Sequence, residues 1–151
     1  IVNGPVAYYE QTRKAPVYWN YWSASPTLYY AFFDKSTDLE IPGTMAALNE
    51  LAAPPTYYDY FIIERFTDTD TGNMVVIVYG YTGYGTFAGA LYVKEVLFPG
   101  VLADLTKLPS VQILKWTDGN GNGLPDHLSF SPGPGEDSLT IVYAPDGILL
   151  P

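Results

Sequence analysis

The chain has 151 residues, 48% of them hydrophobic, and a formal net charge of −9. This size favours a single domain over residues 1–151 with its own core, and the acidic balance argues against nucleic acid or an anionic membrane surface as partner. The absence of Cys excludes disulfides and thiol chemistry, and no apolar run is long enough for a membrane span. The 14 Tyr exceed what one core can use, so many are expected at a surface or interface.

The first 26 residues are aromatic and interrupted by Pro. Val17–Trp22 is predicted to be a strand, and residues 1–12 to be an extended arm that adds to a sheet edge of a neighbouring subunit. The alternative is an edge strand of the same domain. Two Trp residues suggest a sugar-stacking platform, with core or contact surface as the alternative. The residues assigned to assembly are Ile1, Val2, Val6, Tyr8, Trp19 and Trp22.

Residues 27–66 predict two further strands with a helix between them. Thr27–Phe33 and Tyr57–Phe66 are rich in aromatic and β-branched residues. Thr44 is placed as the N-cap of a helix over Met45–Ala52, with its apolar residues on one face. The Pro-Pro pair that follows ends this helix.

The segment Asp68–Asn73 is a polar turn with a strand expected on each side. Its carboxylates, Asp68 and Asp70, are candidates for a second metal site. The alternative is a hairpin loop in which these side chains accept hydrogen bonds from the backbone.

Residues 74–116 predict a βαβ crossover. Met74–Tyr79 is a continuous apolar run, typical of a central strand buried on both faces. A helix over Phe87–Phe98, capped by Thr86, and a strand over Val111–Trp116 follow, so the two strands are expected to be parallel. The Gly-rich turn before the helix lacks both Gly-x-Gly-x-x-Gly and a P-loop Lys, which favours a packing turn over a nucleotide site.

The stretch Asp118–Asp126 has the ligand spacing of a calcium-binding loop. Side-chain oxygens occur at every second position, and Gly123 allows the sharp turn. The predicted Ca²⁺ ligands are Asp118, Asn120, Asn122, Leu124 through its carbonyl oxygen, and Asp126.

The match to an EF-hand is incomplete, because Ser129 stands where that motif has a bidentate Glu. A strand precedes the loop, so the sequence predicts a free-standing loop of the kind found in secreted proteins. The remaining ligand is water, Asp137 or a carboxylate of another chain, and the alternative is a Gly/Asn-rich turn with no ion. With two formal charges, the expected affinity is in the range of roughly 0.1–1 mM.

Residues 132–151 predict a flexible Pro/Gly stretch, a C-terminal strand over Leu139–Tyr143 and an apolar tail. The predicted fold class is therefore α/β: a compact mixed sheet with a βαβ crossover and helices packed on it. Extended β-rich segments are expected at the N- and C-terminal ends.

Three stretches resemble archaeal S-layer proteins. Val75–Ala90, Val-Val-Ile-Val-Tyr-Gly-Tyr-Thr-Gly-Tyr-Gly-Thr-Phe-Ala-Gly-Ala, resembles their segment Val-Ile-Val-Val-Ala-Gly-Tyr-x-x-x-Asp-Thr-Arg-Ala-Ala-Ala. Ile41–Leu51 is similar to the Gly-Gly-Pro-x-x-Asn-x-x-Thr-x-x-Leu region before that segment, and Val111–Asp126 is similar to a strand and loop of the same group. The resemblance covers residues 27–126 and implies extracellular assembly without catalysis.

The function predicted from the sequence is a structural, self-assembling extracellular subunit of a filament, sheath or S-layer-like array, stabilised by Ca²⁺ and partnered by its own copies. With one His and no Cys, the chain lacks the usual ligands of a catalytic zinc ion and has no thiol nucleophile. No catalytic triad is indicated, so no enzyme activity is expected. A start at Ile1 rather than Met suits a secreted protein after signal removal, or an excerpt. The alternative is a calcium-dependent carbohydrate-binding module that contacts a surface glycan through Trp19 and Trp22.

Overall fold

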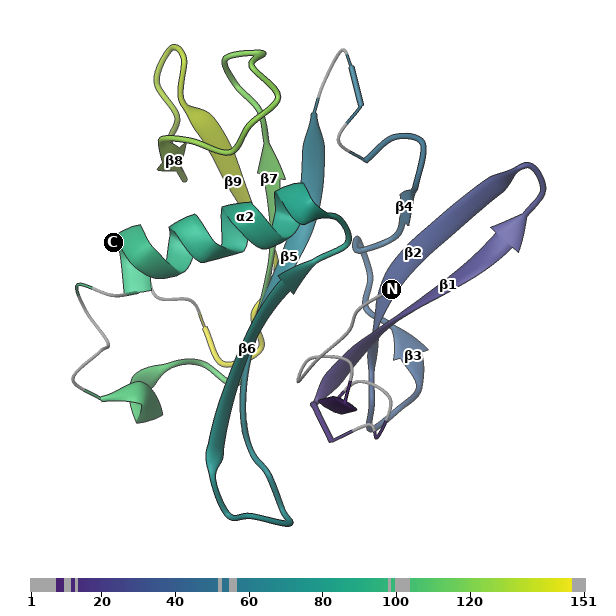
Figure 1. Ribbon diagram of the computed structural model, residues 1–151, viewed down its shortest axis with the longest axis vertical. Helices are drawn as coiled ribbons and strands as arrows, with labels where there is room; N and C mark the ends of the chain where they lie inside the picture. Colours follow the sequence, from purple (N-terminus) through teal and green to yellow (C-terminus); the bar gives the residue numbers. More distant parts are fainter. Residues whose placement is uncertain are drawn as a thin grey trace.

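The structure is a computed structural model that describes residues 8, 9, 12, 14–51, 53–54, 57–97, 99 and 104–147. The fold is mixed α/β and mostly β, with two sheets, one of them a curled half-barrel, and one 15-residue helix packed on sheet B. Figure 1 shows the helix α2 crossing in front of sheet B, with sheet A beside it. The predicted α/β class is confirmed.

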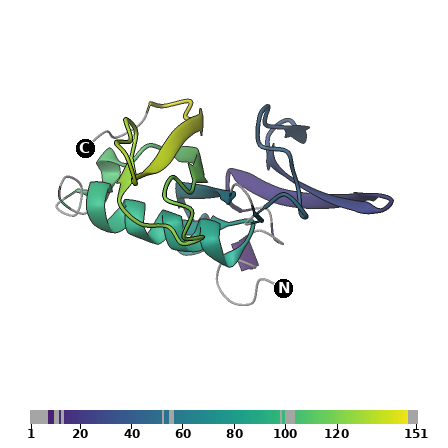
Figure 2. The ribbon, with the colours of Figure 1, turned by 90° about the horizontal axis from the view of Figure 1, so that it is seen from above.

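Sheet A is built around one long hairpin. Its strands are β1 (Val17–Ala24), β2 (Thr27–Asp34), β3 (Leu39–Glu40) and β4 (Ala46–Ala47), and β2 pairs with each of the others. The two-residue connection Ser25-Pro26 fixes the register of the hairpin, with Ala24 opposite Thr27. Figure 2 shows this hairpin extending away from the rest of the molecule.

Sheet B has the strand order β6-β5-β7-β9-β8. Its members are β5 (Tyr58–Thr67), β6 (Met74–Gly80), β7 (Val111–Thr117), β8 (Leu128–Ser129) and β9 (Asp137–Tyr143). Both β6 and β7 pair antiparallel to β5, so they run parallel to each other, as expected for the crossover. The strands predicted from the sequence are all present, with small differences at their ends.

The core has two layers, one on each face of sheet B. Strand alternation sends Tyr60 and Ile62 of β5 towards sheet A, where they meet Phe32 in one hydrophobic cluster. The intervening Phe61 and Ile63 point to the other face and pack with the helix. Because β5 is buried on both sides, it is the central strand of the fold.

The prediction that Met74–Tyr79 is a central strand is wrong. β6 forms an edge of sheet B, and Met74 and Val76 are 40% and 37% exposed. The strand is apolar because both of its faces contribute to the core: Val78 packs in the cluster beneath the helix, and Ile77 and Tyr79 belong to the cluster that faces sheet A.

The predicted helix over Met45–Ala52 is also wrong within the described residues. Ala46–Ala47 forms β4, which pairs with β2, and Leu48 N donates to the Leu28 carbonyl at 2.8 Å. Thr44 is fully buried, and its hydroxyl accepts from Phe32 N at 3.1 Å and donates to the Ile41 carbonyl at 2.8 Å. Pairing with β2 therefore replaces the hydrogen bonds of a helix.

The main helix begins earlier than predicted. α2 spans Gly83–Tyr92 and continues as a π-helical turn, η1, over Val93–Leu97. Thr82 is its N-cap, and the Thr82 hydroxyl accepts from Tyr84 N at 3.1 Å. The Thr86 hydroxyl, predicted to be the cap, accepts from Gly80 N instead. A short 3-10 helix, η2, lies at Leu105–Lys107.

A buried carboxylate explains this start point. Asp59 of β5 has no exposed surface, and its Oδ2 accepts from Thr82 N at 3.0 Å and Gly85 N at 2.8 Å. Burial raises the pKa of Asp59, while the hydrogen bonds from Thr82, Gly85 and the backbone of Tyr60 lower it. The carboxylate thus ties the first turn of α2 to the central strand.

We predict that Asp59→Ala lowers the free energy of unfolding by about 2–4 kcal/mol, because it leaves buried N–H groups of the first helical turn without an acceptor. Urea denaturation followed by circular dichroism measures this loss. Asp104→Ala is the matched control, since Asp104 caps only the short helix η2 and should cost about 1 kcal/mol. Equal losses in the two variants would contradict the anchoring role of Asp59.

Candidate functional site

The predicted calcium loop follows β7 and curls around the carboxylate of Asp118. Asp118 Oδ1 accepts from Asn120 N at 3.0 Å and from Gly121 N at 2.7 Å, and Oδ2 accepts from Gly123 N at 2.6 Å. Gly123 has a φ of 75°, which explains why the sharp turn needs glycine at this position. Three backbone N–H groups of the loop are thus held by one carboxylate.

The side chains of Asn120 and Asn122 converge on Asp126. Asn120 Nδ2 donates to Asp126 Oδ1 at 2.9 Å, and Asn122 Nδ2 donates to Asp126 Oδ2 at 2.8 Å. The amide oxygens are also engaged, because Asn120 Oδ1 accepts from Asn122 N at 2.9 Å and Asn122 Oδ1 accepts from Leu124 N at 2.7 Å. The loop thus gathers two carboxamides and one carboxylate, whose oxygens are the donor type that Ca²⁺ prefers, and a bound cation would have to replace the amide contacts to Asp126.

Asp137 anchors the loop to the core. It is fully buried, and it accepts hydrogen bonds from Trp116 Nε1 at 2.8 Å, Gly119 N at 2.9 Å and Asp126 N at 2.9 Å. The sequence offered Asp137 as an additional metal ligand. Because three donors already point at its carboxylate, the geometry favours a positioning role that holds both ends of the loop.

Close contact with the neighbouring strand explains why the second residue of the loop is glycine. A Cβ at Gly119 would lie 1.9 Å from the Glu136 carbonyl oxygen, so only glycine fits beside the start of β9. Leu124, the predicted carbonyl ligand, has its side chain 53% exposed, and its N–H donates to Asn122 Oδ1 at 2.7 Å. The role of its carbonyl oxygen stays a prediction.

Among the described residues, no group of three or more His, Cys, Asp or Glu side chains is arranged to hold a metal ion. A cation in the loop would therefore depend on the two carboxylates of Asp118 and Asp126 together with amide and backbone oxygens. This donor set fits a hard cation bound with modest affinity, as the charge count of the sequence predicts.

The second candidate metal pair already has a positively charged neighbour. Lys14 Nζ lies 3.2 Å from Asp68 Oδ1 and also contacts Asp70 Oδ2. Asp68 further accepts from Asp70 N and from the Thr71 hydroxyl, and its pKa is lowered, chiefly by the Asp70 N–H. The second metal site stays a prediction, and the geometry favours the hairpin-loop alternative.

The residues assigned to assembly fall into separate places. Ile1, Val2 and Val6 lie outside the described residues. Tyr8 is 48% exposed and its hydroxyl accepts from Lys14 Nζ at 3.0 Å, while the neighbouring Tyr9 packs edge-on against Phe66 at 5.2 Å.

Trp19 and Trp22 point to opposite faces of the β1–β2 hairpin, because they are three residues apart in a strand. Trp19 packs against the core between the sheets and lies 5.6 Å from the ring of Tyr30. Trp22 instead stacks on Tyr29 at 5.9 Å. The two indoles therefore do not form the single platform that the sequence suggested.

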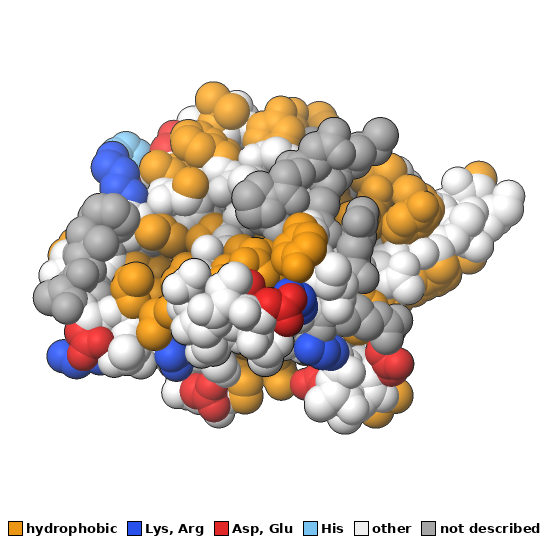
Figure 3. Space-filling view, turned by 60° about the horizontal axis from the view of Figure 1, so that its bottom comes forward, with side chains coloured by type: hydrophobic (Ala, Val, Ile, Leu, Met, Phe, Trp, Pro, Cys, Tyr) orange, Lys and Arg blue, Asp and Glu red, His pale blue; other side chains and the backbone are white. Residues whose placement is uncertain are grey.

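The face that carries Trp22 is an aromatic surface, here called the outer aromatic face. Its members are Tyr18, Trp22, Tyr29 and Phe33. Tyr18 stacks on Phe33 at 5.6 Å, and Phe33 meets Trp22 edge-on at 6.5 Å. In the described part of the chain, the two hydrophobic core clusters do not include these four rings. Figure 3 shows hydrophobic side chains along part of the projecting hairpin.

Sequence reasoning missed Tyr18, Tyr29 and Phe33 as members of this face. The available signal was the register, since a two-residue turn at Ser25-Pro26 would place Trp22 opposite Tyr29 and Tyr18 opposite Phe33. The hydrophobic count alone does not separate these rings from core residues.

No family model, no curated protein and no solved structure matches this chain. In the part of the chain that the structure describes, no helix combines the length and the apolar character needed to cross a membrane. The candidate sites therefore rest on their own geometry.

We predict that about 10 mM Ca²⁺ raises the melting temperature of the wild type by about 3–10 °C. This corresponds to a stabilisation of about 1.5–3 kcal/mol for a site in the affinity range expected here. Asp126→Asn keeps the size of the side chain but removes half of the loop's charge, so it should abolish most of the calcium-dependent increase. Differential scanning calorimetry with and without a chelator measures both effects.

Asp146→Asn is the control for this experiment, because it neutralises an exposed carboxylate that accepts from Ser110 N, away from the loop. It should leave the calcium response intact. If Ca²⁺ does not change the melting temperature of the wild type, the result favours the alternative that the loop is a turn that binds no ion.

Proposed function

We propose that this chain is a structural, self-assembling extracellular subunit of a cell-surface filament, sheath or S-layer-like array, stabilised by Ca²⁺. The observation that carries the proposal is the outer aromatic face on a hairpin that projects from the body of the protein (Figure 2). These half-buried rings keep part of their apolar area available to a partner, and aromatic residues are enriched where proteins meet.

The charge of the chain supports a role for calcium in assembly. Subunits with a net charge of −9 repel one another at short range. A divalent cation in the loop lowers that charge and stabilises the folded subunit through linkage. The resemblance to archaeal S-layer proteins agrees with this combination.

We assign no catalytic role to the buried carboxylates. Asp59 and Asp137 each accept several hydrogen bonds from the helix start and from the loop, and these contacts account for their burial. The raised pKa of Asp59 follows from its burial, and the anchoring hydrogen bonds oppose that rise.

A calcium-dependent carbohydrate-binding module is the second candidate, favoured by the half-buried rings of the outer aromatic face. In this function the rings would stack on sugar units. The calcium loop follows β7 in sheet B and lies apart from the hairpin of sheet A (Figures 1 and 2). A cation there would not contact a sugar on the outer aromatic face, which makes this candidate the weaker one.

We expect electron microscopy of the purified protein in millimolar Ca²⁺ to show ordered polymers that dissociate when a chelator is added. Mg²⁺ at equal concentration is the control, since it screens charge but fits a flexible oxygen loop poorly. Polymers that persist in chelator would overturn the role of calcium. Monodisperse particles under every condition would overturn assembly.

The carbohydrate alternative makes a different prediction. Trp22→Ala should abolish retardation by polysaccharides in affinity gel electrophoresis, whereas Trp19→Ala should retain it, because Trp19 lies on the other face of the hairpin. If no polysaccharide retards the wild type, the second candidate is rejected.

A further inference from the structure

The outer edge of β6 carries backbone groups that are ready to pair with another strand. The Asp68 N–H bonds to the Asn73 carbonyl at 2.8 Å, so Val75, Ile77 and Tyr79 face β5 in the ladder that follows. The N–H and C=O groups of Met74, Val76 and Val78 consequently point outwards. They make no hydrogen bond with any other described residue.

This edge has none of the usual features that protect strands from association. Met74–Tyr79 contains no charged residue, Pro or Gly, and its pairing with β5 is free of bulges. Natural edge strands are normally blunted by one of these devices. Met74 and Val76 also keep more than a third of their surface exposed.

The other sheet edges in the described part of the chain differ from β6. β3, β4 and β8 contain two residues each. On β1, the outward N–H of Val17 donates to Glu64 Oε2 at 2.8 Å, and that of Tyr21 donates to the side chain of Asn20 at 2.8 Å. β1 is also long and uncharged, but these outward N–H groups already have acceptors, whereas those of Met74, Val76 and Val78 bond to no described residue.

We propose that β6 is an acceptor edge, onto which residues 1–7 of a second copy of this chain add as a further strand. This inference rests on the proposed function, because it names the contact through which subunits join. The structure supplies the acceptor, and the sequence supplies a donor of matching chemistry.

The donor segment suits an uncharged edge. Ile-Val-Asn-Gly-Pro-Val-Ala has seven residues without a charge, as many as β6. If the backbone groups of Val2, Gly4 and Val6 hydrogen-bond to β6, the backbone nitrogen of Pro5 faces solvent. The lack of an N–H on Pro5 then costs no hydrogen bond in an outermost strand. Extended, the segment reaches about 23 Å.

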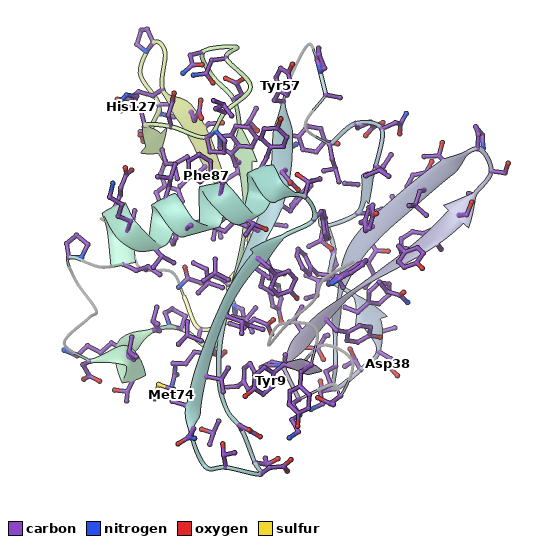
Figure 4. The ribbon with its side chains drawn as sticks, viewed as in Figure 1. Tyr9, Asp38, Tyr57, Met74, Phe87 and His127 are labelled. Carbon is purple, nitrogen blue, oxygen red and sulfur yellow. The ribbon has the colours of Figure 1, made fainter. Side chains whose placement is uncertain are left out.

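The segment also starts from a fixed point close to sheet B. Tyr9 packs against Phe66 of β5 at 5.2 Å, and Figure 4 places Tyr9 and the outer residue Met74 on opposite sides of the β5–β6 hairpin. The anchor thus faces sheet A while the acceptor edge faces outwards. A donor held in this way can enter the edge of a neighbouring copy, and head-to-tail repetition of the contact gives an open polymer.

The test uses two full-length variants that each remove one half of the contact. Val76→Pro deletes an outward N–H that the ladder to β5 does not use, so the acceptor is blocked while the fold is kept. The double substitution Val2→Asp and Val6→Asp places two charges in the donor. Val76→Thr, which keeps both the N–H and the β-branched shape, is the matched control. Val76→Lys is the second edge variant if Val76→Pro does not fold.

Analytical ultracentrifugation should show polymers for the wild type and for Val76→Thr, but monomers for the edge variant and for the donor variant. An equimolar mixture of the two blocked variants should form one-to-one heterodimers and nothing longer, because one supplies an intact donor and the other an intact edge.

Four results would overturn the inference. Polymers of Val76→Pro and Val76→Lys equal to those of the wild type would leave the proposed function standing but place the contact elsewhere. Dimers of the donor variant alone would show that two β6 edges pair with each other. If the two blocked variants stay monomeric when mixed, residues 1–7 do not add to the β6 edge of another copy. A monomeric wild type would overturn the proposed function and this inference together.

Discussion

Two buried carboxylates on the central strand fix the elements on either side of sheet B. Asp59 faces the helix and accepts from the first turn of α2, while Glu64 faces sheet A and accepts from Val17 N at the start of β1. Both residues have no exposed surface. Burial of an ionisable group is costly unless hydrogen bonds compensate it, so each carboxylate requires its partner element to remain in place. The rest of the fold depends on these two attachments.

Much of the strand pattern could be predicted from the sequence, because strands with aromatic and β-branched residues differ clearly from their polar turns. The errors arose where local propensity competed with pairing. The Ala-rich stretch after Thr44 favours a helix in isolation, but β2 offers it hydrogen bonds and the buried Thr44 hydroxyl secures the turn before it. Tertiary contacts determine the secondary structure of that segment, and these contacts cannot be read from a single sequence.

The same limit explains the position of β6. A continuous apolar run indicates burial on both faces, and it does not reveal whether a neighbour lies on each side. Only the strand order shows that β6 has a neighbour on one side alone. An apolar strand at an edge is a liability for a protein that stays monomeric. It is an asset for a protein that polymerises.

The candidate calcium loop was predictable because its spacing is local. Asp118, Asn120, Asn122 and Asp126 are close in sequence, and the loop brings the last three together. The anchor Asp137 needed the structure, since it arrives from the next long strand of the sheet. The aromatic surface needed the hairpin register, which separates Trp19 from Trp22 and joins Trp22 to Tyr29.

The position of Asp137 determines what a cation in the loop can influence. Asp137 accepts from Asp126 N and from the indole of Trp116, and that indole lies parallel to the ring of Tyr84 in α2, with the ring centres 6.5 Å apart. A cation that holds Asp126 in place therefore stabilises the layer between sheet B and the helix. The aromatic hairpin belongs to the layer on the other face of sheet B. In the proposed assembly, calcium would act through the stability and the charge of the body, while the contacts between subunits would be made by surfaces that contain no part of the loop.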